Sequence, residues 1–184
     1  MRALLITFGL VFASVVGRAD PIENPEFKQW ASFKSGTSIV MSMTSEFNGM
    51  KSASKIGTKL LEVGADKLVL EVETATVVNG MEFKGPPTKR EVTKTIDVPK
   101  VEGAPGTPKP GVKPEGTTEE GTETVKIGDV EVKTKWMKYK SKTAAGEVEG
   151  QTWMSDEIPG GMFKSETKTG TITSKMVIVE FKKP

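Results

Sequence analysis

Lys67–Glu73, with the sequence KLVLEVE, is the stretch that decides the fold. Its two leucines and Val72 alternate with charged residues and Val69. Successive side chains of a β-strand point to opposite faces, so a period of two places one set of residues together on one side. The stretch therefore predicts a strand with one buried face.

The same period recurs along much of the chain. Ile39, Met41 and Met43 alternate with more polar neighbours, and the later part of the chain gives further strands. These are expected at Glu131–Lys140, Glu147–Met154, Met162–Thr169 and Thr171–Phe181. Residues 52–63 are open between strand and helix. The pattern predicts a mainly β protein.

Two short turns predict hairpins and their registers. Asn79-Gly80 and Gly128-Asp129 each separate two apolar residues, and such pairs tolerate the positive φ that a two-residue hairpin turn requires. The first turn would pair Val78 with Met81 and Thr76 with Phe83. The second would pair Ile127 with Val130 and Val125 with Val132.

One short helix is predicted at residues 25–34. Asn24 is suited to cap it, and the proline that follows suits its first turn. Phe27, Trp30 and Phe33 recur at a spacing of three, which places them on one face. That face needs an apolar surface, so we expect the helix to pack on the sheet.

Residues 1–19 are typical of a secretory signal peptide. Arg2 precedes an uncharged, apolar run, and small residues stand before a cut expected after Ala19. Cleavage would lower the 26 basic residues of the whole chain to 24, equal to the 24 acidic ones. A neutral chain gives no reason to expect nucleic acid or an anionic membrane as a partner. We expect an exported protein, periplasmic or extracellular, with no permanent membrane span after cleavage.

Residues 20–184 are expected to form a single β domain with a flexible insertion at 99–121. That range holds five prolines and five glycines with two valines, so it cannot pack as a regular element. A linker between two domains is the alternative. Each flank would then be near the lower size limit for independent folding, so one sheet with an insertion is favoured.

The chain contains no histidine and no cysteine. Nucleophilic triads, thiol redox chemistry and zinc sites built from these residues are therefore excluded. No phosphate-binding glycine loop occurs. Adjacent acids at Asp156-Glu157 are read as part of a turn with Ser155, because neighbouring carboxylates on a turn lack the separation of a glycosidase pair. The sequence predicts no catalytic residue, metal site or cofactor, and no enzyme. A glycan hydrolase that works with carboxylates alone stays open as an alternative, and it would require two distant acids that converge in a cleft.

The methionines and tryptophans are the remaining candidates for a site. Met41 and Met43 place two thioethers on one strand face, which can fill a core, line an adaptable groove, or bind Cu(I). Tryptophans can form part of a core or line a pocket. Trp30, Met41, Met43 and Trp153 are the predicted ligand-binding residues, on a concave face of the sheet.

Four segments resemble a group of small exported bacterial proteins of uncharacterised function that are frequent in planctomycetes. They are Asn24–Gly36, Leu61–Val63, Leu68–Val72 and Trp153–Lys164. More remotely, a helix followed by a long antiparallel meander is similar to the half-barrel of periplasmic lipoprotein carriers. That resemblance implies a curved sheet with an apolar concave face that can hold acyl chains.

The expected fold is a single antiparallel sheet, curved into a half-barrel or open sandwich, with the short helix packed on it. The expected function is non-catalytic binding or carriage, in the cell envelope, of an apolar ligand or a lipid-modified partner. An envelope structural or protein-interaction module without a ligand cavity is the alternative, with an envelope protein as its partner.

Overall fold

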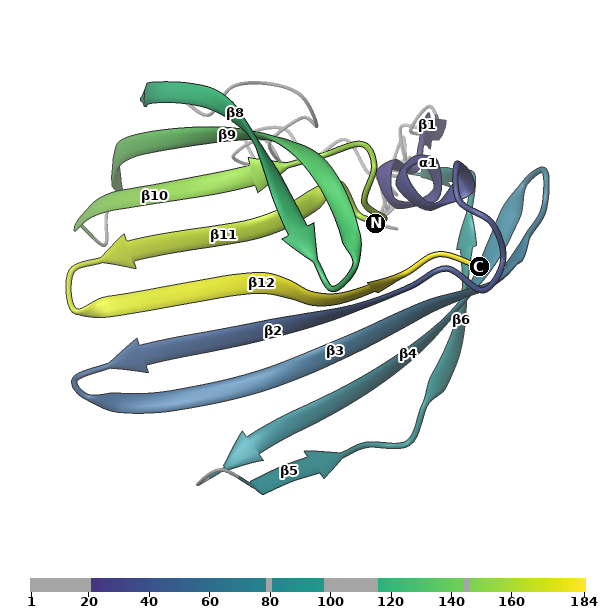
Figure 1. The fold of residues 1–184 in the computed structure, drawn as a ribbon, viewed down its shortest axis with the longest axis horizontal. Helices are drawn as coiled ribbons and strands as arrows, with labels where there is room; N and C mark the ends of the chain where they lie inside the picture. The colour runs from purple at the N-terminus through teal and green to yellow at the C-terminus, as the bar shows by residue number, and fades with distance from the viewer. Residues whose placement is uncertain (1–20, 79–80, 98–115, 144–145) are drawn as a thin grey trace, which may run out of the picture.

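The computed structural model describes residues 21–78, 81–97, 116–143 and 146–184, which form one large antiparallel sheet, a two-stranded ribbon and one helix (Figure 1). The helix is α1 (Pro25–Ala31). The strands are β1 (Pro21–Glu23), β2 (Ser38–Phe47), β3 (Met50–Val63), β4 (Lys67–Val78), β5 (Met81–Lys84), β6 (Thr88–Thr93), β7 (Thr95–Asp97), β8 (Thr117–Ile127), β9 (Val130–Thr143), β10 (Gly146–Met154), β11 (Met162–Thr169) and β12 (Ile172–Lys182).

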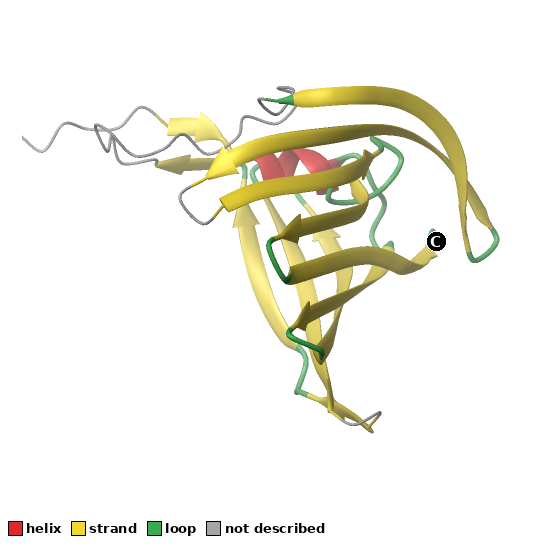
Figure 2. Ribbon diagram, turned by 90° about the vertical axis from the view of Figure 1, so that its left-hand side faces the viewer, coloured by secondary structure: helices red, strands yellow, loops and turns green. Residues whose placement is uncertain are grey.

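The large sheet has the strand order β5-β4-β3-β2-β12-β11-β10-β9-β8, and β6 pairs with β4 beside β5. The sheet is open and curved, with the helix inside the curve (Figure 2). This confirms the predicted fold class. A second small sheet, the pairing of β1 with β7, was not predicted.

Both predicted hairpins form in the predicted registers. Val78 pairs with Met81, and Ile127 pairs with Val130. In the second turn Gly128 has a φ of 60°, the left-handed conformation that makes glycine suitable there. The residues between Val78 and Met81 lie outside the described part.

The helix is shorter than the predicted 25–34. It ends at Ala31, and Ser32 caps it through a backbone hydrogen bond to the Trp30 carbonyl. The chain then joins the sheet: the Gly36 amide donates to the Leu60 carbonyl at 2.8 Å, and the Leu60 amide donates to Thr37 at 2.9 Å. Because the chain already pairs with β3 at Gly36, there is no room for another helical turn after Ala31.

Other expectations are resolved in part. Residues 52–63, left open between strand and helix, belong to β3. Of the expected insertion at 99–121, residues 117–121 belong to β8, because they pair with β9, and residues 99–115 lie outside the described part. The expected signal peptide at 1–19 also lies outside it. Among the described residues, no helix is long and apolar enough to span a membrane.

The helix and one face of the sheet form the main core. Register places Leu70 opposite Leu60, and Ile39 opposite Phe181, so these side chains share a face. Phe27 and Trp30 of α1 belong to the same buried cluster. The other buried members of the cluster are Leu68, Val92, Ile127, Val132, Ile158 and Ile178.

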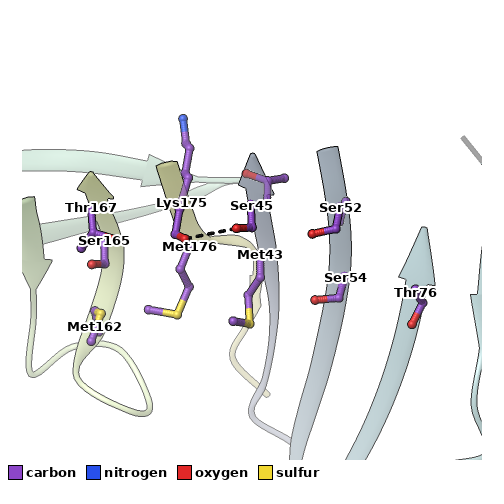
Figure 3. A pocket seen from close by; sticks show the side chains of 13 residues that line it. Met43, Ser45, Ser52, Ser54, Thr76, Met162, Ser165, Thr167, Lys175 and Met176 are labelled. Atoms are coloured by element: carbon purple, nitrogen blue, oxygen red, sulfur yellow. Dashed lines mark hydrogen bonds between the residues drawn. The ribbon is translucent and has the colours of Figure 1, made fainter. Parts of the chain in front are cut away.

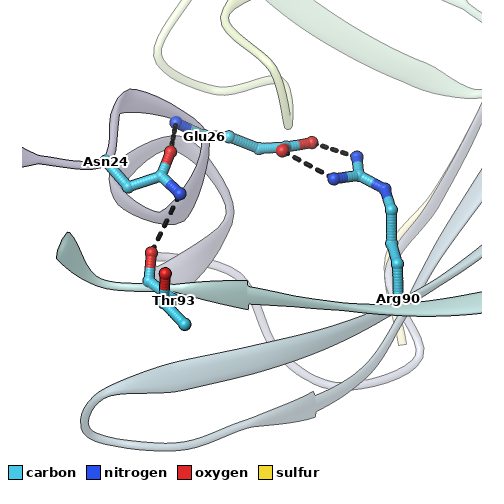
Figure 4. A network of polar contacts seen from close by, with 4 residues as sticks. All are labelled: Asn24, Glu26, Arg90 and Thr93. Carbon is cyan, nitrogen blue, oxygen red and sulfur yellow. Dashed lines mark hydrogen bonds and ion pairs between the residues drawn. The ribbon is translucent and has the colours of Figure 1, made fainter. Parts of the chain in front are cut away.

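A polar network attaches the helix start to β6 (Figure 4). Asn24 Oδ1 accepts a hydrogen bond from the Glu26 amide at 3.0 Å, and Asn24 Nδ2 donates to the Thr93 carbonyl at 2.9 Å. The Glu26 carboxylate accepts hydrogen bonds from both terminal nitrogens of Arg90. The network fixes where the helix begins and which strand it lies beside.

Replacement of Asn24 tests this attachment. Asn24→Ala should lower the free energy of unfolding by about 1–2 kcal/mol, because it removes the helix cap and the bond to β6. Asn24→Asp keeps the cap acceptor but loses the donor, so its loss should be smaller. Urea denaturation measures both.

Lys28→Ala is the control on the same helix. The ammonium of Lys28 lies 3.7 Å from Glu23, but both side chains are exposed, so the change should cost less than about 0.5 kcal/mol. The attachment would be refuted if Asn24→Ala cost no more than Lys28→Ala.

Candidate functional site

The helix leaves part of its side of the sheet uncovered. Seven helical residues span about 10 Å, whereas the fourteen residues of β3 span about 46 Å. Beyond the helix lies a groove of about 450 Å³, here called the open groove. It is lined by Met43, Thr44, Ser45, Ser52, Ala53, Ser54, Thr76, Met162, Ser165, Thr167, Ser174, Lys175 and Met176 (Figure 3).

Methionine side chains form the apolar part of the open groove. Met43 of β2 lies directly opposite Met176 of β12, and Met162 at the start of β11 lies further along the floor (Figure 3). Met43 is 40 % exposed, although it lies on the same face as the buried Ile39. The thioethers are therefore available to a ligand, and their flexibility suits an irregular apolar partner.

Hydroxyl groups form the rest of the floor. Ser45 and Ser174 are cross-strand neighbours with their hydroxyl oxygens 3.3 Å apart, within hydrogen-bond distance. Ser54 lies beside Met43, and Ser165 lies beside Met176. This mixture gives a surface that water can wet but that carries no charge. The alternation of Ser52 and Ser54 along β3 is a sequence pattern that could have predicted that both lie on one face of the strand.

Only one charged residue is found among the described residues that line the open groove. Lys175 points away from the methionines (Figure 3), and its ammonium lies 3.3 Å from the carboxylate of Glu166. Burial acts to raise the pKa of Glu166, but hydrogen bonds from Lys164 and Lys175 outweigh it and lower the pKa. Glu166 is therefore ionised at neutral pH, and its charge balances Lys175.

A second hollow of about 510 Å³ lies over β8 to β12. Most of the side chains that line it, among them Lys138, Lys140, Glu149, Glu166 and Lys168, alternate with those of the groove face and so belong to the opposite face of the sheet. The two share Thr167, Ser174 and Lys175. On the groove face the ring of Tyr139 lies over Gly150, where any Cβ would overlap the ring. Burial raises the pKa of the Tyr139 phenol, so this side chain is uncharged.

One row of cross-strand neighbours crosses the groove face of the sheet and includes residues of the open groove. The row runs from β9 through β10, β11, β12 and β2 to β3. Five spacings of about 4.8 Å between adjacent strands give a length of about 24 Å. The row therefore runs across the strands. Its members are Tyr139, Gly150, Thr167, Ser174, Ser45 and Ser52.

The structure separates three of the predicted ligand-binding residues along one face. Met43 lines the open groove. Met41 is half-buried between the groove and the core, next to Ile178 in register. Trp30 is 3 % exposed, and its side chain packs in the core between the helix and the sheet. Of these three, Met43 alone is exposed enough to reach a ligand.

Trp153, the fourth predicted residue, is on the other face of the sheet. It pairs with Lys164, which pairs with Val177, and Val177 pairs with Ser42 rather than with Met43. Ser42 and Met43 are successive residues of one strand, so they face opposite ways. The structure therefore does not bring Trp153 to the open groove.

The tryptophan is instead held within a polar setting. The ammonium of Lys164 lies 4.2 Å from the centre of the Trp153 ring, and Glu123 accepts a hydrogen bond from the indole nitrogen. The ring is 7 % exposed. These contacts join β10 to β11 through Lys164 and to β8 through Glu123.

Asp156-Glu157 forms part of a turn, as the sequence indicates. The Glu157 amide donates to the Ser155 hydroxyl at 3.1 Å, and the Ser155 amide donates to the Gly161 carbonyl at 2.9 Å. Ser155 is 8 % exposed and binds the turn through its backbone and side chain. The two acids are thus neighbours on a surface turn.

The close packing of Tyr139 on Gly150 gives a test of the β9–β10 pairing on the groove face. Gly150→Ala should lower the free energy of unfolding by about 1–3 kcal/mol, because the new methyl group displaces the ring. In a Tyr139→Ala background the same change should cost little. Thermal denaturation of the four proteins in this cycle measures the coupling.

Gly57→Ala is the matched control on β3. A Cβ there would lie 3.8 Å from the Glu73 carbonyl oxygen, an ordinary contact, so the change should be neutral or slightly stabilising. Equal losses at Gly57 and Gly150 would contradict the packing described.

Comparison with known proteins gives distant structural likenesses. No family model matches the chain, and no curated protein matches it. A "putative lipoprotein" from Parabacteroides distasonis has 14 % identity and a TM-score of 0.39, covering 81 % of this chain and 96 % of that chain. A DUF1329 family protein from Desulfovibrio piger has 8 % identity and a TM-score of 0.26, covering 86 % and 91 %. The proposals below therefore rest on the geometry of the chain itself.

Proposed function

We propose that the protein is a non-catalytic carrier in the cell envelope that binds an acyl chain in the open groove. The observation that supports this most directly is the uncovered, methionine-lined part of the helix side of the sheet. Its volume of about 450 Å³ lies within the range of about 300–1,000 Å³ that is usual for small-molecule sites. The acyl chain belongs either to a free lipid or to a lipid-modified protein.

The chemistry of the floor favours an apolar, elongated ligand. Met43, Met176 and Met162 supply adaptable apolar contacts. The lining contains no carboxylate, and Lys175, its one charge within the described chain, pairs with Glu166. A charged substrate would therefore find no counter-charge on this floor. A hydrocarbon chain carries no charge and therefore needs no counter-charge.

The volume of the open groove also suits such a ligand. Burying about fifteen methylene groups contributes about 12 kcal/mol, and association costs at least about 4 kcal/mol. The remainder corresponds to a dissociation constant of about 1 µM. The hydroxyl rows of Ser45 and Ser174 would face the polar end or solvent.

Binding is tested with the purified protein and a dansyl-labelled fatty acid, with palmitate as the competitor. We expect one saturable site with a dissociation constant of about 1 µM. Met43→Asp with Met176→Asp should weaken binding at least tenfold, about 1.4 kcal/mol, because it places two carboxylates on the apolar floor. Fluorescence titration measures both.

Val63→Asp is the matched control. Val63 is 42 % exposed, close to the 40 % of Met43, but it ends β3 at the helix end of the sheet and does not line the groove. Its affinity should equal that of the unmodified protein. A protein inert to the probe, or a doubly substituted protein that binds it normally, would rule out the proposal.

A further inference from the structure

Tyr139 of β9 places its phenol hydroxyl on the groove face, above the neighbouring strand β10. A Cβ at Gly150, its cross-strand neighbour, would overlap both Cζ and the hydroxyl oxygen of Tyr139. The outer end of the ring therefore lies over Gly150, and the side chain extends across β10 toward β11. Glycine inside a strand often marks a place where another group approaches closely, and here that group is the phenol.

The phenol hydroxyl lies next to the open groove. Gly150 pairs with Thr167 of β11, and Thr167 lines the groove. Adjacent strands are about 4.8 Å apart, so about one strand spacing separates the hydroxyl from the edge of the groove at Thr167. A ligand that fills the groove and extends past Thr167 would meet the Tyr139 hydroxyl.

The structure gives this hydroxyl no task within the protein. In the described part of the chain, the Tyr139 hydroxyl has no hydrogen-bond partner. Burial alone raises the pKa of the phenol, and no hydrogen bond or neighbouring charge contributes. The group is therefore uncharged and partly shielded from water. A hydroxyl in that position gains free energy when a ligand supplies an acceptor.

We propose that the ligand of the open groove carries a neutral carbonyl group at the head of its acyl chain, as an ester or an amide, and that Tyr139 donates a hydrogen bond to the carbonyl oxygen. This inference rests on the proposed function and names its ligand more closely. The hydrocarbon chain lies over Met176 and Met43, and the carbonyl lies on the Thr167 side.

A free carboxylate suits the same place less well. An ionised group is costly to remove from water unless a cation compensates for the lost hydration. Lys175 is the one cation among the described groove residues, but it points away from the methionines and pairs with Glu166 (Figure 3). Tyr139 and Thr167 offer neutral hydroxyl groups, which are sufficient for a carbonyl oxygen. The acyl chain is therefore part of a glycerolipid or of an acylated protein.

Displacement of the dansyl-labelled fatty acid tests the head group. The competitors share one palmitoyl chain: palmitate, the ester monopalmitoylglycerol and the amide N-palmitoylglycinamide, each below its micelle-forming concentration. We expect at least one neutral compound to displace the probe at a concentration about tenfold lower than palmitate. Displacement by the ester alone would assign a glycerolipid, and displacement by the amide alone would assign an N-acylated protein. Either result supports the neutral carbonyl.

Tyr139→Phe tests the hydrogen bond, because it keeps the ring over Gly150 and removes only the hydroxyl. It should weaken the binding of the neutral competitors about fivefold. Palmitate, and N-phenyl-1-naphthylamine as an apolar probe without a carbonyl, should bind as before. The midpoint of thermal unfolding should not change, because the packing of the ring is retained.

Thr173→Val is the matched control. It also removes one hydroxyl group, but Thr173 lies on the opposite face of β12 from Ser174 and does not line the open groove. All affinities should equal those of the unmodified protein.

The outcomes separate this inference from the proposed function. A protein that never binds the dansyl-labelled fatty acid would refute the carrier function itself. A protein that binds the probe, but accepts palmitate as readily as both neutral compounds, would refute the neutral carbonyl and leave the carrier function intact. The hydrogen bond would be refuted if Tyr139→Phe kept its affinity for the neutral competitors, or lost affinity for the naphthylamine to the same degree.

Discussion

The contact between Trp30 and Phe27 of the helix and the leucines of β3 and β4 is the interaction on which the rest of the structure depends. The side chains of Leu60 and Leu70 are fully buried because the helix covers them. A helix of two turns cannot cover the whole length of the strands. One end of the sheet is therefore a packed core, and the other end remains an open surface.

The composition of the uncovered end of the sheet follows from the short length of the helix. A fully apolar face left uncovered would promote association, so polar groups must interrupt it. Serines and threonines supply them between Met43 and Met176, while the opposite face of the sheet bears paired charges such as Lys140 with Glu149 and Lys175 with Glu166. The open groove is thus a compromise between solubility and an apolar floor.

Local rules in the sequence predicted local structure well. Asn24 caps the helix, and the turn at Gly128 sets the β8–β9 register, because both depend on neighbouring residues. The position of Trp153 could not be predicted this way. Its face relative to Met43 depends on the register that runs from β10 through β11 and β12 to β2, in which the β12–β2 pairing joins distant segments. In addition, β10 alternates without an obvious buried side. The same dependence on distant pairing hid β6 and the β1–β7 ribbon.

The middle of the large sheet is where β2 pairs with β12, the first and last of its strands. Met41 lies beside Ile178, although almost the whole domain separates them in sequence. Loop closure over such a distance costs entropy before any contact compensates, which slows folding. Each half of the sheet can assemble from its own hairpins as it is synthesised, but the two halves join only when the last strand is complete. Pairing of the C-terminal strand is therefore the step that completes the fold. Until it pairs, the chain forms two separate ribbons, and each ribbon has an unpaired strand edge.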